Sequence, residues 1–162
     1  FFSEYVEGSG FNKALEIYNP TTATVDLSAY SVKLFSNGAA TASSSLTLSG
    51  TLAPGATVVI CNPSITVTTA CNVLSGVINH NGDDAYTLDK GGVVVDAFGQ
   101  VGLDPGVGWG VAGSGLVTND ATLRRKAPVF RGSVPPASPA VWDLSVEWNA
   151  FPNNTLDGLG SR

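Results

Sequence analysis

The sequence predicts an all-β protein, a β-sandwich of about seven to nine strands. Short runs of β-branched and aromatic residues recur through the chain, clusters of turn-forming residues separate them, and helix signals are few. The chain has 162 residues, of which 43% are hydrophobic. That length suits one domain with its own core, and we expect a single domain over residues 1–162.

The N-terminal half carries four strand signals, in which apolar residues alternate with polar ones or β-branched residues dominate. We expect these strands at 14–19, 31–35, 45–48 and 57–61. Asn37-Gly38 and Pro54-Gly55 are turn-forming pairs between them. The last of the four is apolar enough to be buried on both faces.

The C-terminal half is less regular. We expect strands at 85–88, 93–98, 122–125, 129–131 and 144–148. The first two flank Asp89-Lys90-Gly91-Gly92, a strong hairpin signal. One short helical turn is predicted within 69–75. Residues 99–119, rich in glycine, and residues 132–140, with three prolines, are predicted to be irregular loops.

The charge pattern and the length of the apolar runs exclude two kinds of interaction, nucleic-acid binding and a membrane span. Eight basic and thirteen acidic residues give a net charge of −5. The sole basic run is Arg124-Arg125-Lys126, whose members would alternate between the faces of a strand and form a solvated rim. Contact with phosphate or with an acidic neighbour is the alternative. We therefore predict no nucleic-acid binding, which relies on many contacts from Lys and Arg to phosphate. No apolar run approaches the ~20 residues of a membrane span.

The start of the chain and its cysteines both favour export. The first residue is Phe1 and no signal-peptide pattern follows it, so we expect a mature secreted or cell-surface chain whose signal has been removed. A trimmed fragment is the alternative. Cys61 and Cys71 predict a disulfide that closes one loop. Two buried thiols in a reducing compartment are the alternative.

An ordered set of segments resembles the lamin tail domain family in its bacterial secreted form. The segments are Ser3–Ser9, Asn12–Asn19, Val25–Leu34, Leu52–Gly55, Asn81–Asp84, Val95–Gly99, Thr122–Lys126 and Glu147-Trp148. The resemblance implies an immunoglobulin-like β-sandwich without enzymatic activity. It also implies a role in attachment or assembly, because such modules accompany secreted nucleases, phosphatases and surface proteins.

The residues themselves predict no catalytic site and no cofactor. Nucleophilic catalysis needs a base beside the nucleophile, and the one histidine, His80, is predicted to be an exposed turn residue. Gly108, Gly110 and Gly113 match a dinucleotide-binding pattern by letter alone, since no helix signal follows them.

The acidic residues include one candidate metal site, for Ca²⁺. Asp83 and Asp84 follow Asn81-Gly82, and hard oxygen ligands of this kind suit Ca²⁺. No complete calcium-loop pattern is present, and such residues commonly bond their own backbone in turns. We keep Asp83 and Asp84 as weak calcium candidates and predict no other metal.

The N-terminal segment is the candidate for self-assembly. It consists of Phe1, Phe2, Ser3, Glu4, Tyr5, Val6 and Glu7. A strand with a free end can add to an exposed sheet edge of another copy, and a head-to-tail contact of this kind builds an open fibre. The first hypothesis is thus an extracellular structural or adhesive protein that binds copies of itself. The alternatives are a strand paired within its own sandwich, and an accessory module of a secreted nuclease or other exported enzyme that binds a surface or the linked enzyme domain.

Overall fold

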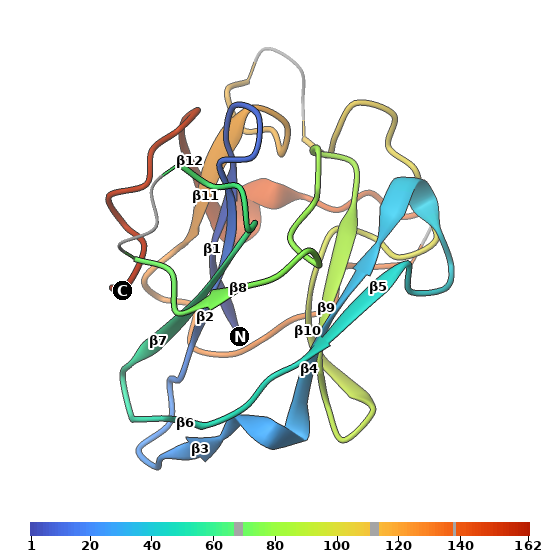
Figure 1. The fold of residues 1–162 in the computed structure, drawn as a ribbon. Helices are drawn as coiled ribbons and strands as arrows, with labels where there is room; N and C mark the ends of the chain where they lie inside the picture. The colour runs from blue at the N-terminus through green and yellow to red at the C-terminus, as the bar shows by residue number, and fades with distance from the viewer. Residues whose placement is uncertain (67–69, 111–113, 138) are drawn as a thin grey trace.

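The computed structural model describes residues 1–66, 70–110, 114–137 and 139–162, and Figure 1 shows two main sheets facing each other. The larger sheet has the order β12 (Trp148–Pro152), β11 (Ala121–Arg125), β1 (Phe2–Glu7), β2 (Lys13–Tyr18), β7 (Thr57–Cys61), β8 (Val73–Leu74). The smaller has the order β10 (Val93–Phe98), β9 (Ala85–Lys90), β4 (Tyr30–Phe35), β5 (Ser44–Thr47). A short pair, β3 (Val25–Asp26) with β6 (Thr51–Leu52), lies at one end.

The core lies between the two main sheets and is rich in aromatic residues. The rings of Tyr5 on β1 and Phe98 on β10 are stacked with centroids 4.1 Å apart. Trp142 and Trp148 each meet Phe98 edge-on at 5.1 Å. Residues from Phe2 to Trp148 contribute to this one buried cluster, so strands from both ends of the chain share a core.

Most predicted strands are confirmed, and the β9–β10 hairpin is closed by Gly91 and Gly92 at φ 56° and 84°. Positive φ at both central turn residues is the geometry of a type I′ hairpin. The described residues form twelve strands, more than the seven to nine expected, because the two-residue strands β3, β6 and β8 gave no sequence signal.

Three local predictions were wrong. Residues 129–131 form no strand, since Pro128 cannot donate to a ladder and Val129 N instead bonds to Lys126 O in a turn. The predicted strand at 144–148 begins with a 3-10 turn, η3 (Leu144–Val146), capped by Asp143, and only Trp148 starts β12. The described part of 69–75 contains β8 rather than a helical turn, and residue 69 lies outside the described residues.

The outer face of the larger sheet has a second, smaller apolar cluster. Val6, Ala14 and Val59 are buried there with Ile65 and Cys61, and Leu156 and Leu159 of the C-terminal segment pack against them. The chain end therefore covers strands at the centre of the sheet. Among the described residues, no helix is long and apolar enough to cross a membrane.

The predicted disulfide is present within this cluster: Cys61 is bonded to Cys71. It fixes the end of β7 to the loop before β8. Replacing both cysteines by alanine is expected to lower the free energy of unfolding by about 2–3 kcal/mol, since a crosslink of this loop length restricts the unfolded chain by that amount. Urea unfolding measures the change, and an unchanged midpoint would contradict it.

Candidate functional site

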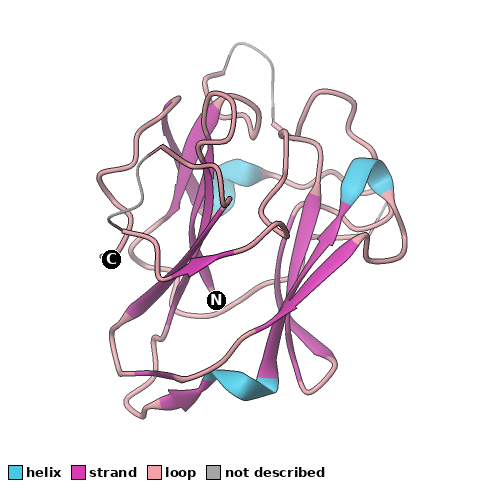
Figure 2. Cartoon of the chain, in the orientation of Figure 1, coloured by secondary structure: helices cyan, strands magenta, loops and turns pink. Residues whose placement is uncertain are grey.

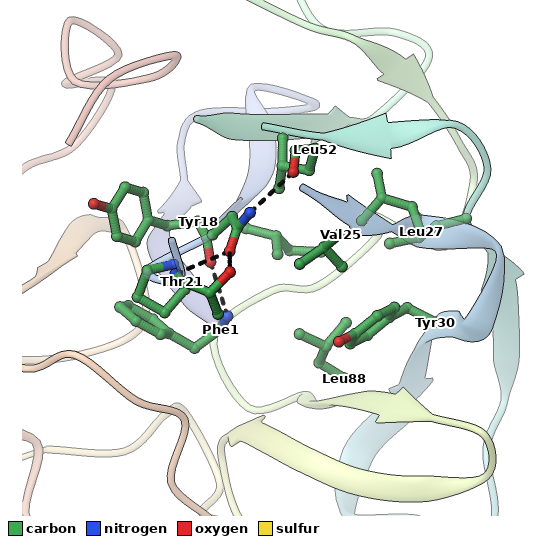
Figure 3. Close-up of a pocket in the computed structure, with 12 residues that line it drawn as sticks. Phe1, Tyr18, Thr21, Val25, Leu27, Tyr30, Leu52 and Leu88 are labelled. Carbon is green, nitrogen blue, oxygen red and sulfur yellow. Dashed lines mark hydrogen bonds between the residues drawn. The ribbon is translucent and has the colours of Figure 1, made fainter. Parts of the chain in front are cut away.

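A small apolar pocket opens at the end of the sandwich, next to the β3–β6 pair (Figure 3). Its volume is about 80 Å³. Aliphatic side chains form its walls, namely Ile17, Val25, Leu27, Leu48, Leu52 and Leu88. Phe1, Tyr18 and Tyr30 add aromatic rings, and Pro20 and Thr21 lie exposed at the opening. We call this the end pocket.

Two buried polar groups at the end pocket, the Phe1 amino group and the Asn19 side chain, already have partners, and the Phe1 amino group donates to Tyr18 O at 3.1 Å. The Asn19 side chain donates from Nδ2 to Leu52 O at 2.9 Å and accepts at Oδ1 from Thr21 N at 3.0 Å. The pocket can thus hold an apolar group, and its lining residues include no carboxylate, histidine, lysine or cysteine.

Two cations lie over the aromatic rings of the pocket rim. Lys90 Nζ is 5.4 Å from the centre of the Tyr30 ring. Arg162 Cζ is 4.5 Å from the centre of the Phe1 ring and 5.1 Å from that of Tyr18. All three contacts fall within the range of cation–π attraction.

A second feature lies in the segment before β12, where three valines are exposed and line one groove. Val134, Val141 and Val146 are 61%, 84% and 67% exposed. Asp143 and Glu147 line the same groove. We call the three side chains the valine ridge. Exposed apolar side chains gathered in this way are typical of interaction surfaces.

A buried ion pair holds this segment to the sandwich. Arg125 on β11 donates to Asp96 on β10 at 2.7 Å and to Glu147 at 2.6 Å. Ser133 is bound on both sides: its N–H donates to Asp96 at 2.7 Å and its hydroxyl to Glu147 at 2.7 Å. The side chains of Arg125 and Asp96 are 0% exposed.

Gln100 fixes the middle of the segment. Its Nε2 donates to Pro136 O at 2.6 Å and to Ala140 O at 2.8 Å, and its Oε1 accepts from Trp142 N. The ridge therefore sits on a backbone that is tied down at several points, although only Val146 of the three valines lies in a regular element, η3.

The expectation for His80 was wrong, since its side chain is fully buried rather than exposed in a turn. Its Nε2 donates to Val6 O at 2.7 Å, and Nδ1 lies 2.9 Å from the Tyr86 hydroxyl. Burial lowers the pKa of His80 to about 3, so the ring is neutral near pH 7. Both nitrogens are engaged within the core, which leaves neither for a substrate.

The candidate assembly segment, Phe1–Glu7, is already paired within its own sandwich. β1 lies between β2 and β11, with Tyr5 opposite Leu15 on one side and Leu123 on the other. Phe1–Glu7 are all buried. The structure thus has the alternative arrangement, a strand paired within its own sandwich, because β11, about 118 residues further along the chain, pairs with its second edge. Assembly through this strand stays a prediction.

The remaining candidates serve local structure. Asp84 accepts from Asn37 N at 2.9 Å and from Asn81 N at 3.1 Å. Burial raises the pKa of Asp83 and of Asp84. Among the described residues, no three His, Cys, Asp or Glu side chains are grouped as metal ligands. Calcium binding at this turn stays a prediction.

Neighbouring residues of the basic run point to opposite faces of β11, as the alternation predicts, but they do not all form a solvated rim. Arg124 points to the outer face, where its Nε lies 3.2 Å from Glu4. Arg125 points the other way and is buried, which corrects the expectation of a solvated side chain.

Sequence reasoning did not find the end pocket or the valine ridge. The pocket is lined from several strands and loops, so no local pattern marks it. The ridge valines are isolated in an aperiodic, proline-rich stretch, where burial cannot be told from exposure.

The comparisons with known proteins give a family and no individual relative. No curated protein and no solved structure gives a significant match to the chain. The family model of the lamin tail domain matches residues 1–102, which include β1–β10. That match covers more than half of the chain and agrees with the all-β, immunoglobulin-like sandwich. The chain therefore belongs to the lamin tail domain family, a family of non-catalytic domains.

Proposed function

We propose that this domain is a non-catalytic structural or adhesive module of an exported protein, and that it assembles with copies of itself outside the cell. The observation that carries the proposal is the valine ridge, three exposed apolar side chains on a backbone held by the Arg125 network and by Gln100. A mobile loop would lose conformational entropy on binding, whereas a fixed ridge is already ordered for contact.

Two further observations support the proposal. The buried, hydrogen-bonded His80 is unsuited to catalysis, which favours binding over chemistry. The Cys61–Cys71 disulfide is compatible with an oxidising, extracellular setting. The ridge also lies beyond the residues that match the family, so the surface belongs to the C-terminal third of this chain.

Sedimentation velocity over a range of protein concentrations tests the proposal. We expect wild-type protein to form larger species as its concentration rises, and Val141→Asp to stay monomeric, because a charge at the most exposed ridge position opposes burial. Val107→Asp is the matched control, since Val107 is 74% exposed and lies outside the ridge.

A wild-type chain that stays monomeric at every concentration would overturn the proposal. It would favour the alternative in which the domain serves a linked enzyme and binds a different partner. Equal loss of assembly in Val141→Asp and Val107→Asp would also count against the ridge.

A further inference from the structure

We infer that the end pocket of one copy receives the valine ridge of the next copy, with the Val141 side chain as the group inserted. This inference rests on the proposed self-assembly and adds the acceptor site and the geometry of the contact. In this contact each copy uses its ridge on one neighbour and its pocket on another, which makes the contact heterologous.

The size and chemistry of the pocket select an aliphatic group. A cavity of roughly 150 Å³ holds a benzene ring. The end pocket, at about 80 Å³, suits a smaller branched group such as the side chain of valine. Val141 is 84% exposed, the highest value among the large apolar side chains of the described residues. Phe130 is also exposed, at 69%, but its ring is too large for this space.

The charges around the two surfaces are complementary. Lys90 and Arg162 lie over the aromatic rim of the pocket, whereas Asp143 and Glu147 line the groove beside the ridge. Asp26 at the pocket side caps a turn, so the pocket also carries an acidic group. At the ridge side Lys126 bonds to Ser145 O and Arg125 is paired with Glu147, which leaves Asp143 as the exposed acidic group of the groove. Two copies with a net charge of −5 repel each other overall, and this pairing of rims directs the approach.

Arg125 lies between the two surfaces: its Cζ is 5.2 Å from the centre of the Phe1 ring at the pocket, and its Nη2 donates to Glu147 beside the ridge at 2.6 Å. Figure 2 shows the short helix beside β3, at the pocket, at the bottom of the view. The helix η3, which follows Val141, lies in the upper half of the same view. A head-to-tail contact leaves one free ridge and one free pocket at each step. Such a contact extends into an open chain of copies unless its rotation closes a ring.

A mixing experiment with two variants tests the inference. Val25→Phe fills the pocket from its half-buried wall and leaves the ridge intact, and Val141→Asp blocks the ridge and leaves the pocket intact. Each variant alone is expected to be monomeric by sedimentation velocity. An equimolar mixture should form a 1:1 dimer and nothing larger, because only one functional ridge and one functional pocket remain.

Charge reversal provides a second test that leaves the pocket wall unchanged. Lys90→Glu should weaken assembly by about tenfold at low salt and much less at high salt, because it places an acidic rim opposite an acidic groove. Far-UV circular dichroism and thermal melts show whether each variant is folded.

The outcomes separate this inference from the proposed function. If Val141→Asp is monomeric but Val25→Phe and Lys90→Glu assemble as wild type does, the ridge binds elsewhere and the pocket is not its acceptor. If the mixture stays monomeric although wild type assembles, the contact is not heterologous and the inference fails alone. A wild-type chain that stays monomeric would overturn both the proposed self-assembly and the inference that the pocket receives the ridge.

Discussion

Replacing Arg125 by methionine is expected to lower the free energy of unfolding by roughly 3–5 kcal/mol, because it leaves the Asp96 carboxylate buried without its partner charge. Asp96 accepts from Arg125 at 2.7 Å and from Phe2 N at 2.7 Å, and it is completely buried. The two backbone N–H groups that remain bonded to it, from Phe2 and Ser133, cannot supply a full positive charge. Urea unfolding at constant ionic strength measures the loss.

The matched control is Arg131→Met, which removes the same charge from an exposed position six residues further on. We expect a change within about 0.5 kcal/mol for this surface substitution. Comparable losses in the two variants would mean that the Arg125 ion pair adds nothing specific to stability. Arg125→Met should also loosen the valine ridge, because Glu147 and Ser133 both depend on the guanidinium.

The second large effect is a loss of stability in acid that depends on His80. Burial lowers its pKa to about 3, whereas the unfolded chain has a value near 6.5. The unfolded state therefore binds a proton in this interval that the folded state does not. The stability that neutral His80 contributes to the free energy of unfolding is fully present above about pH 6.5. It declines as the pH falls towards 3, by roughly 4–5 kcal/mol in all.

Glu4 acts in the opposite sense and must be separated from His80. Burial raises its pKa to about 7, so the folded state keeps a proton that the unfolded state loses between about pH 4.5 and 7. Stability arising from Glu4 therefore falls as the pH rises through that interval. The two slopes offset each other over much of the range in the wild-type protein.

The difference between wild type and His80→Gln isolates the histidine. We expect the stability advantage of wild type to be largest near pH 7 and to shrink steadily as the pH falls, as measured by urea unfolding at several pH values. Glu4→Gln is the companion variant. Its free energy of unfolding should rise more steeply with pH than that of wild type between pH 4.5 and 6.5, because the opposing effect of Glu4 is removed. A pH-independent difference for His80→Gln would show that the ring is not protected from protonation.

Strand positions could be predicted wherever the information was local. Four of the five residues of segment 57–61 are β-branched, and the segment forms β7 with both faces covered. The glycine pair between β9 and β10 marked its hairpin, since few other residues accept positive φ at both positions. Segments whose state depends on a distant partner were less predictable: β8 has two residues and exists because Val73 and Leu74 pair with β7.

The candidate site illustrates the same limit. Phe1–Glu7 was correctly predicted to be extended, but nothing in those seven residues shows that β11 completes the sheet beside them. His80 lies in a turn-like sequence, two residues after Ile78. It is buried because Val6 and Tyr86 contact it from two strands. The local sequence alone cannot distinguish a buried histidine from an exposed one.

The sequence by itself determined the all-β class, most strand positions, the disulfide and the family resemblance, because alternation, turn residues and cysteine spacing act over a few neighbouring residues. Only the tertiary structure decided which strands are central, which charges are buried and which valines face water. Those properties follow from pairings such as β1 with β11 and Arg125 with Asp96, and solvent exposure depends on what distant segments of the chain cover.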